Sequence, residues 1–379
     1  MQIAFTRNER PTIGVELELM LVDRETGQLA NTASKLLDEM GVGHPDGVHP
    51  KAKHELFECT VEIITGVCDG PDAAREDLQA TLDELIDVAD RHGYDVISAG
   101  SHPFGLVTEQ VVSPAQRYAD LIEEMQWAAR RLLIFGTHVH VGVSDGETAI
   151  AVANELQRHL PLLLALSASS PYFENADTGL ASARTKVFES LPTAGLPPQL
   201  DGWSDFEAFM RTLLEAECIS SIREVWWDIR PHPDYGTVEL RMCDAVGTLD
   251  EAATLATIAQ ALVVQIDERR RAGEELVRPR EWTVRENKWL AARHGMDARL
   301  IVDEDGARRP ARELLVDLVD ELRPIADRFG AAAHLDRALA TADDPGYVRQ
   351  RRTLSEGGTP SDVVTRLAAE LRNGHASVS

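Results

Sequence analysis

Acidic residues stand at alternate positions inside a segment that otherwise has the composition of a β-strand. In residues 12–22 (TIGVELELMLV), Glu16 and Glu18 lie two positions apart, so both carboxylates project from one face of a strand. The intervening leucines project from the other face. Two adjacent carboxylates repel each other unless a cation lies between them. The pattern therefore predicts either a cation site or a strand whose polar face is turned to solvent.

A second acidic segment spans residues 56–65 (LFECTVEIIT). In a regular strand Glu58 and Glu62 share a face, whereas Glu55 falls on the opposite one. Glu55 could join Glu62 only where the chain bends or bulges. The alternative interpretation is a half-exposed strand without a ligand.

Two histidines lie in the apolar segment 135–143 (FGTHVHVGV). His138 and His140 share one face of the predicted strand, and imidazole is both a metal ligand and a phosphate partner. A single histidine there would favour a structural role. Two at alternate positions favour a functional one.

Segments 223–230 and 236–243 predict a hairpin around Asp234-Tyr235-Gly236. A carboxylate and a guanidinium two positions apart form either a structural ion pair or a metal ligand beside a phosphate contact, because the arginine fork matches phosphate oxygens. The residues expected to share a face are Trp226, Asp228 and Arg230 on the first strand and Thr237, Glu239 and Arg241 on the second.

Helical segments separate these strands, and the polar residues concentrate on the strands. Charged strands require a reason, so we predict an α+β fold whose mixed or antiparallel sheet lines a wet, polar cavity with one face and is covered by helices on the other. Residues 169–202 predict an ordered loop, and Pro161 is expected to kink or split its helix. Helices are expected at 70–92, 114–133, 147–168, 204–218, 249–271, 281–294, 310–327 and 359–373, and a short strand at 94–99.

The charge balance restricts the binding partners. With 63 acidic and 38 basic residues, the net charge of −25 repels nucleic acid and anionic lipid, so we expect neither as a partner. It also repels ATP, so any nucleotide site needs metal ions beside the phosphates. No stretch of about 20 uncharged apolar residues and no secretory signal is recognisable, and we expect a cytoplasmic protein that spans no membrane. The four cysteines contain no CxxC pair, and we expect buried thiols without disulfides.

Familiar nucleotide motifs are absent from the sequence. There is no GxxxxGK[ST], no GxGxxG after a strand and no GxSxG. Several carboxylates in one oxygen-rich site select Mg²⁺ or Mn²⁺ over zinc. Periodicity and spacing alone therefore predict a polyanionic cavity for divalent metal.

Five segments together carry a resemblance to a known family. The chain resembles the type 2 glutamate–cysteine ligases, or carboxylate–amine ligases, which are related to glutamine synthetase. The resemblance implies an antiparallel sheet curled into a funnel with helices packed outside, and we expect one catalytic domain over 1–379 that is mostly helical from about residue 300. The segments are GVELEL at 14–19, HELFECTVEI at 54–63, THVHVGV at 137–143, DTGLASARTKVFESLPTAG at 177–195 and WWDIRPHPDYGTVELRMCD at 226–244.

The resemblance also implies an activity and a set of site residues. It implies ATP-dependent formation of an amide through an acyl phosphate, with glutamate and cysteine as small-molecule substrates and Mg²⁺, or alternatively Mn²⁺, on the phosphates. Arg241 and His140 are expected to contact the nucleotide phosphates, and Arg230 and Arg184 a substrate carboxylate or phosphate. Placing Glu55 among the ligands accepts a bend in the second strand. The implied metal ligands are Glu16, Glu18, Glu55, Glu62, His138 and Glu239.

Two alternative functions remain open, and one segment departs from the family pattern. His138 and His140 on zinc would suit a metal-dependent amide hydrolase, and a non-catalytic paralogue could bind ATP or an amino acid as a sensor. Asn175-Ala176 precedes Asp177 where the family pattern predicts glycine and a basic residue, which leaves the amine substrate open. Homo-oligomerisation is also left open.

Overall fold

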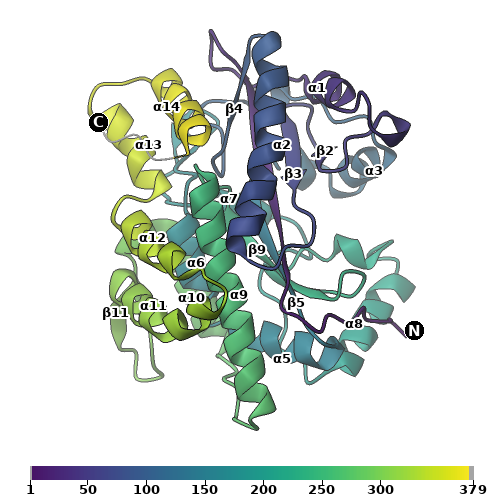
Figure 1. The fold of residues 1–379 in the computed structure, drawn as a ribbon, viewed down its shortest axis with the longest axis vertical. Helices are drawn as coiled ribbons and strands as arrows, with labels where there is room; N and C mark the ends of the chain where they lie inside the picture. The colour runs from purple at the N-terminus through teal and green to yellow at the C-terminus, as the bar shows by residue number, and fades with distance from the viewer. Residues whose placement is uncertain (1, 375–379) are drawn as a thin grey trace.

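An antiparallel seven-stranded sheet forms the centre of the computed structural model, which describes residues 2–374 (Figure 1). The strand order is β2-β3-β1-β5-β9-β8, and β4 pairs with the far end of β1. The α+β class and the antiparallel sheet are confirmed. The sheet is open among the described residues, so the funnel curl stays a prediction. Its strands are β1 (Ile13–Asp23), β2 (Ala52–His54), β3 (Thr60–Ile64), β4 (Tyr94–Ile97), β5 (Gly136–Gly142), β8 (Ile229–His232) and β9 (Thr237–Asp244).

Cross-strand register brings the polar residues of separate strands together. β1 pairs with β5 so that Glu16 lies opposite His138, and with β3 so that Glu18 lies opposite Glu62. On the next pair, His140 of β5 lies opposite Glu239 of β9. Directly opposed residues have Cβ atoms about 5 Å apart. One face of the sheet thus carries a continuous row of carboxylates and imidazoles.

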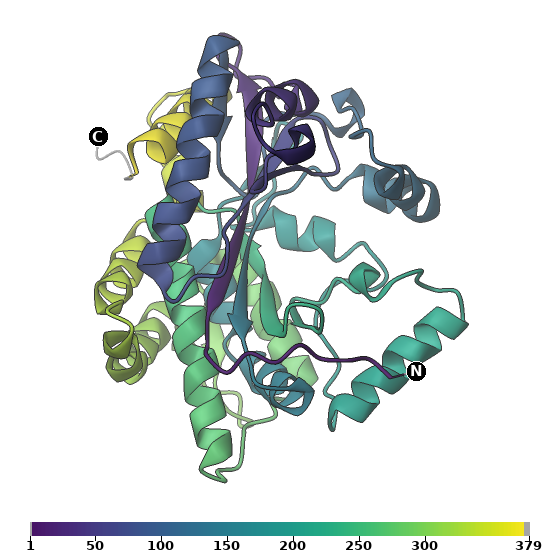
Figure 2. The same ribbon diagram turned by 45° about the vertical axis from the view of Figure 1, so that its right-hand side comes forward.

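Helices cover the opposite face of the sheet. Figure 2 shows α2 and α9 together on one side, while α3 and α8 project on the other. α2 packs on β4 and β1, and α9 packs on β5 and β1. The helices of the first 271 residues are α1 (Ala33–Met40), α2 (Pro71–Arg91), α3 (Gln116–Met125), α4 (Trp127–Arg130), α5 (Gly146–Leu156), α6 (Leu160–Ser167), α7 (Ala183–Phe188), α8 (Trp203–Glu215) and α9 (Leu249–Arg271).

The C-terminal helices pack on this helical layer and on the edge of the sheet. α11 and α12 contact α9, and α14 contacts β4. Helix starts follow their sequence signals: Thr248 and Thr359 form capping boxes at α9 and α14. The remaining elements are α10 (Glu281–His294), α11 (Ala311–Arg328), α12 (Ala332–Asp343), α13 (Gly346–Ser355), α14 (Pro360–Asn373), and the two-stranded sheets β6 (Tyr172–Phe173) with β7 (Ala176–Asp177) and β10 (Arg299–Ile301) with β11 (Arg308–Pro310).

α9 has the length and hydropathy of a membrane-crossing segment. Its most apolar window is 94% buried within the fold. A core helix that packs on all sides has the same composition. The sheet and the C-terminal helices account for its apolar surface.

The structure corrects several of the predicted element boundaries and confirms one predicted helix break. The second acidic strand begins at Thr60, because residues 55–59 form the bend that joins β2 to β3. The segment 147–168 is split, as expected, with Pro161 in the first turn of α6. The 114–133 helix breaks at Gln126, which has a φ of 47°. The loop 169–202 contains β6, β7 and α7, and the first hairpin strand begins only at Ile229.

Candidate active site

A cavity of about 850 Å³ opens on the charged face of the sheet. The site residues expected from the sequence come from β1, β3, β5, β8, β9, α7 and the β2–β3 bend, and all of them line this cavity. The structure therefore brings the whole set together. Its members are Glu16, Glu18, Glu55, Glu62, His138, His140, Arg184, Arg230, Glu239 and Arg241.

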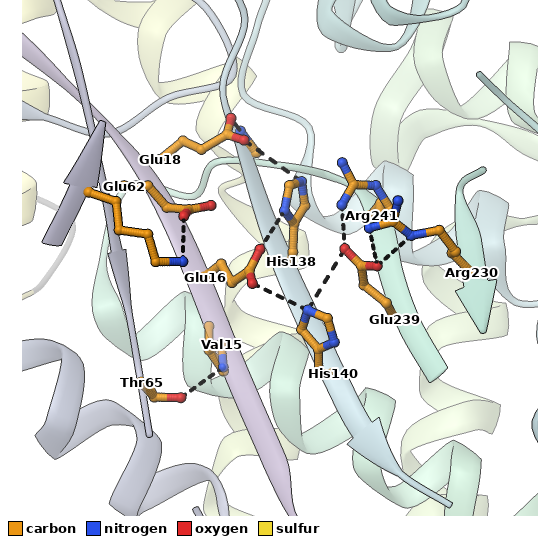
Figure 3. Close-up of polar contacts among 12 residues, drawn as sticks. Val15, Glu16, Glu18, Glu62, Thr65, His138, His140, Arg230, Glu239 and Arg241 are labelled. Carbon is orange, nitrogen blue, oxygen red and sulfur yellow. Dashed lines mark hydrogen bonds and ion pairs between the residues drawn. The ribbon is translucent and has the colours of Figure 1, made fainter. Parts of the chain in front are cut away.

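Glu16 lies at the centre of the cluster, between the two histidines (Figure 3). One carboxylate oxygen is 3.2 Å from His138 Nδ1 and the other is 3.4 Å from His140 Nε2. Although burial opposes ionisation, hydrogen bonds to both imidazoles hold the pKa of Glu16 well below its usual value. Glu16 is therefore an anion that links β1 to β5.

Three further carboxylates crowd one another at the other end of the cavity. Burial, with the charge of Glu62, raises the pKa of Glu18 to about 7. Burial and the charge of Glu18 raise the pKa of Glu55 to about 7. Burial and the charges of Glu16 and Glu55 raise the pKa of Glu62 to about 8. Because three such groups cannot all be ionised together without a positive partner, this end of the cavity is suited to a cation.

The β2–β3 bend explains how Glu55 reaches the cluster. Glu55 lies just beyond β2, where the chain leaves the sheet, and its carboxylate accepts the backbone N–H of Leu56 at 3.1 Å. Glu58, on the same bend, turns away and accepts the hydroxyl and the backbone N–H of Ser34. The expectation that Glu58 shares a face with Glu62 is wrong, because a regular strand does not extend through residue 58.

Two arginines hold Glu239, which is 1% exposed. Arg230 Nε donates to one carboxylate oxygen at 2.8 Å, and Arg241 is ion-paired with the other. Although burial opposes ionisation, Arg230 and Arg241 keep the pKa of Glu239 far below its usual value. Arg230 also donates through Nη1 to the carbonyls of Arg223 and Val225. Arg241 keeps its Nε without a partner in the described part of the chain.

The two imidazoles differ in their protonation. Burial, with the charge of Arg241, lowers the pKa of His138 to about 4, so its ring is neutral at pH 7. For His140, burial is outweighed by Glu239 and Glu16, and its pKa is raised. A neutral ring is the form that binds metal. His138 therefore has the chemistry of a ligand, as the resemblance implies.

Arg184 closes the cavity beside Glu18. It is 3% exposed and donates to the carbonyls of Met242 at 3.4 Å and Arg241 at 3.2 Å. Its Nε has no partner among the described residues. A Cβ at Gly136 would lie 2.9 Å from Arg184 Cζ and 3.0 Å from His138 Nε2, so the missing side chain makes room for the guanidinium.

Asp244 anchors the segment that carries Arg184. It is fully buried and accepts the backbone N–H of Ser169 at 2.9 Å and the hydroxyls of Ser170 and Ser182 at 2.7 and 2.8 Å. Ser170 in turn accepts the backbone N–H of Arg184 at 3.0 Å. This buried network joins the end of β9 to the start of α7.

The structure also contradicts the expectation that Asp228 shares a strand face with Arg230. It does not line the cavity with Arg230; its carboxylate is 2.5 Å from the buried Lys288 Nζ. The segment before Ile229 is not a regular strand, so the alternation of faces does not extend back to Asp228. Trp226 does line the cavity.

Several cavity residues were missed from the sequence. Lys53 Nζ is 3.3 Å from a Glu62 oxygen, and its position two residues before Glu55 was an available signal. Arg117 lies on α3, which carries no motif. His232 and Tyr235 lie inside the quoted motif around the hairpin turn, but their types suggested no role.

Three groups of cavity side chains could each hold a metal ion. Within each group one potential ligand atom per residue lies within 4.8 Å of the others. The oxygen-rich donors and the mutually opposed carboxylates fit Mg²⁺ or Mn²⁺. The groups are Glu16, Glu62 and His138; Glu16, His140 and Glu239; and Glu18, Glu55 and Glu62.

Comparisons with known proteins agree with this geometry. The family described as glutamate–cysteine ligase family 2 matches residues 12–370. A relative from Thermobifida fusca (strain YX), provisionally named glutamate–cysteine ligase 2, is 47% identical over 100% of this chain and 95% of its own. A similarly named relative from Frankia casuarinae (strain DSM 45818 / CECT 9043 / HFP020203 / CcI3), glutamate–cysteine ligase 2-1, is 46% identical over 100% of both chains.

A solved structure shows the shared fold. Glutamate–cysteine ligase from Francisella tularensis, in complex with AMP, superposes with a TM-score of 0.70 over 100% of this chain and 91% of that one. Its sequence is only 13% identical, so this likeness concerns the fold. The family match over residues 12–370 and the similar relatives confirm the resemblance carried by the five sequence segments, and the chain belongs to glutamate–cysteine ligase family 2.

Proposed function

We propose that this ligase joins the carboxylate of glutamate to the amino group of cysteine at the expense of ATP. The observation that carries the proposal is that the five glutamates, two histidines and three arginines expected from the sequence converge in one cavity of a chain from this family. Neither a hydrolytic zinc site nor a degenerate sensor would need so many carboxylates. The entire chain 1–379 acts as one catalytic unit in the cytoplasm.

Mg²⁺ is the metal for which the carboxylates are arranged. Glu18, Glu55 and Glu62 would hold it at one end of the cavity, and Glu16 with Glu239 at the other, where the raised pKa of His140 leaves that ring to the phosphates. His138 would share Glu16 and Glu62 between these ends. When bound, divalent cations neutralise phosphate charge and stabilise the transferring phosphoryl group.

The reaction has two steps, phosphoryl transfer to the carboxylate and then amide formation. A substrate carboxylate oxygen attacks the γ-phosphorus of ATP in line, and the bond to the bridging oxygen breaks to release ADP and an acyl phosphate. The amine nitrogen then attacks the acyl carbon, expels phosphate and loses a proton to give the amide. Positioning and electrostatic stabilisation contribute most of the acceleration in such transfers.

The three arginines have different roles, which follow from their hydrogen-bond partners. Arg230 bonds Glu239 and two backbone carbonyls, and its role is to hold Glu239 in place as an anion. Arg241 bonds Glu239, its Nε has no partner within residues 2–374, and it stabilises charge on the transferring phosphoryl group. Arg184 lies near Glu18, its Nε has no partner among the residues that the structure describes, and it contacts the substrate carboxylate or the acyl phosphate.

Coupled nucleotide turnover tests the proposal. Purified protein is incubated with ATP, Mg²⁺, glutamate and a panel of amines that includes cysteine, and ADP and amide are measured. We expect amine-stimulated ADP release with equal amide formation, abolished by EDTA and restored by Mg²⁺. ADP release that no amine stimulates, or amide hydrolysis without ATP by a zinc-loaded protein, would contradict the proposal.

A further inference from the structure

Tyr235 presents an unusually exposed aromatic ring at the cavity. It lies on the β8–β9 turn, lines the cavity and is 55% exposed. Its ring is parallel to that of His232, with centroids 4.2 Å apart and an interplanar angle of 5°. His232 is only 8% exposed, so it forms the buried layer of a two-ring stack whose outer layer is Tyr235.

The turn that carries this stack is held in place. The Asn8 side chain donates to the carbonyls of Tyr235 at 2.9 Å and Gly236 at 2.8 Å. Gly236 has a φ of +65°, and a Cβ there would lie 2.8 Å from the carbonyl carbon of Thr6. The N-terminal segment therefore packs directly against the turn and limits its movement.

No hydrogen bond at Nδ1 competes with the stacking of the His232 ring in the described part of the chain. Its Nδ1 is buried and has no hydrogen-bond partner among the described residues. An aromatic pair with one open side provides a π surface on which a further planar ring can stack.

The stack lies next to the groups assigned to phosphate. The His140 ring contacts both members edge-on, at 5.7 Å from His232 and 5.7 Å from Tyr235. His140 Nε2 lies 3.8 Å from Glu239 on its other side. A planar base on the outer side of Tyr235 would thus have its phosphates directed past His140 towards Glu239 and Arg241.

We propose that Tyr235, backed by His232, is the platform on which the purine base of ATP stacks. This inference rests on the proposed function, because it assigns one part of the nucleotide in the same cavity. Trp226 is the rival platform, since it also lines the cavity. Tyr235 is favoured because its stack adjoins the His140–Glu239 end of the cluster.

The test compares ligands with and without a base. Binding of ADP and of inorganic pyrophosphate, both with Mg²⁺, is measured by calorimetry for the wild type and for Tyr235→Ala, Tyr235→Phe and Trp226→Ala. Trp282→Ala is the matched control, because Trp282 is a 59% exposed aromatic outside the cavity. Loss of a stacking ring weakens base binding by about tenfold or more.

The expected pattern separates base from phosphate. Tyr235→Ala weakens ADP by about tenfold and leaves pyrophosphate unchanged, while Tyr235→Phe and Trp282→Ala keep ADP affinity within about twofold. The assignment of Tyr235 as the platform would be wrong if Tyr235→Ala bound ADP with wild-type affinity, or if it lost ADP and pyrophosphate affinity equally. It would also be wrong if only Trp226→Ala lost affinity specifically for ADP. A wild-type protein that binds no ADP would instead overturn the proposed function together with the platform.

Discussion

Gly136 leaves a space that Arg184 fills, and adding one methyl group there tests how far activity depends on that guanidinium. In Gly136→Ala the new Cβ would lie 2.9 Å from Arg184 Cζ and 3.0 Å from His138 Nε2. Carbon atoms in ordinary contact are about 3.5–4.0 Å apart. The guanidinium must therefore move by roughly 1 Å, which breaks its hydrogen bonds to the carbonyls of Arg241 and Met242.

The expected cost is small for stability and large for activity. Overpacking costs about 1–3 kcal/mol, and the end of a long side chain can yield, so we expect about 1 kcal/mol. A displacement of about 1 Å in a positioning group can lower turnover by about 100-fold. We expect Gly136→Ala to lose activity to that extent while its melting temperature changes by only a few degrees.

Gly14→Ala is the matched control. Gly14 lies on the neighbouring strand β1, opposite His140, and a Cβ there would meet its nearest atoms at 3.8 and 3.9 Å, which are ordinary contacts. Turnover, the KM values for glutamate and ATP, and thermal denaturation are measured for both variants. If Gly136→Ala retained activity within about threefold of Gly14→Ala, or lost it only by unfolding, the role assigned to this space would be wrong.

Three further predictions concern buried ionisable side chains. Glu239→Gln leaves Arg230 without its carboxylate, so we expect turnover to fall by more than about 100-fold and stability by roughly 3–5 kcal/mol, measured by amide formation and urea unfolding; unchanged turnover would remove Glu239 from the site. Lys288→Met leaves the buried Asp228 without its cation, and we expect a comparable loss of stability. The double variant Lys288→Met with Asp228→Leu should recover most of that stability, and a double variant as unstable as the single one would contradict this. Burial lowers the pKa of His102 to about 4, below its unfolded value of about 6.5, so the unfolded chain takes up the proton first and stability falls by about 3 kcal/mol as the pH drops from 6.5 to 4. Urea unfolding at several pH values should show a weaker fall in this window for His102→Asn, and equal slopes would exclude His102 as a cause.

The sequence by itself determined which chemistry the chain carries. The spacing of Glu16 with Glu18, of His138 with His140 and of Glu239 with Arg241 specified side chains that share a strand face. This follows because adjacent residues of an extended chain point to opposite sides. The same alternation indicated a mixed or antiparallel sheet with one polar face, and the five segments indicated the family.

Only the tertiary structure decided which faces meet and where the alternation stops. The pairing of Glu16 with His138 joins strands more than 100 residues apart in the chain, and no local pattern specifies such a register. Glu55 enters the cavity because the chain bends after β2, whereas Asp228 leaves it for Lys288 because its segment is not a strand. The space at Gly136 for Arg184 likewise exists only once α7 packs on β9 and the Arg184 side chain reaches Gly136 of β5. The physical reason is that side-chain direction within a strand is a local property of the backbone, whereas register, bends and shared volume are set by packing between distant segments.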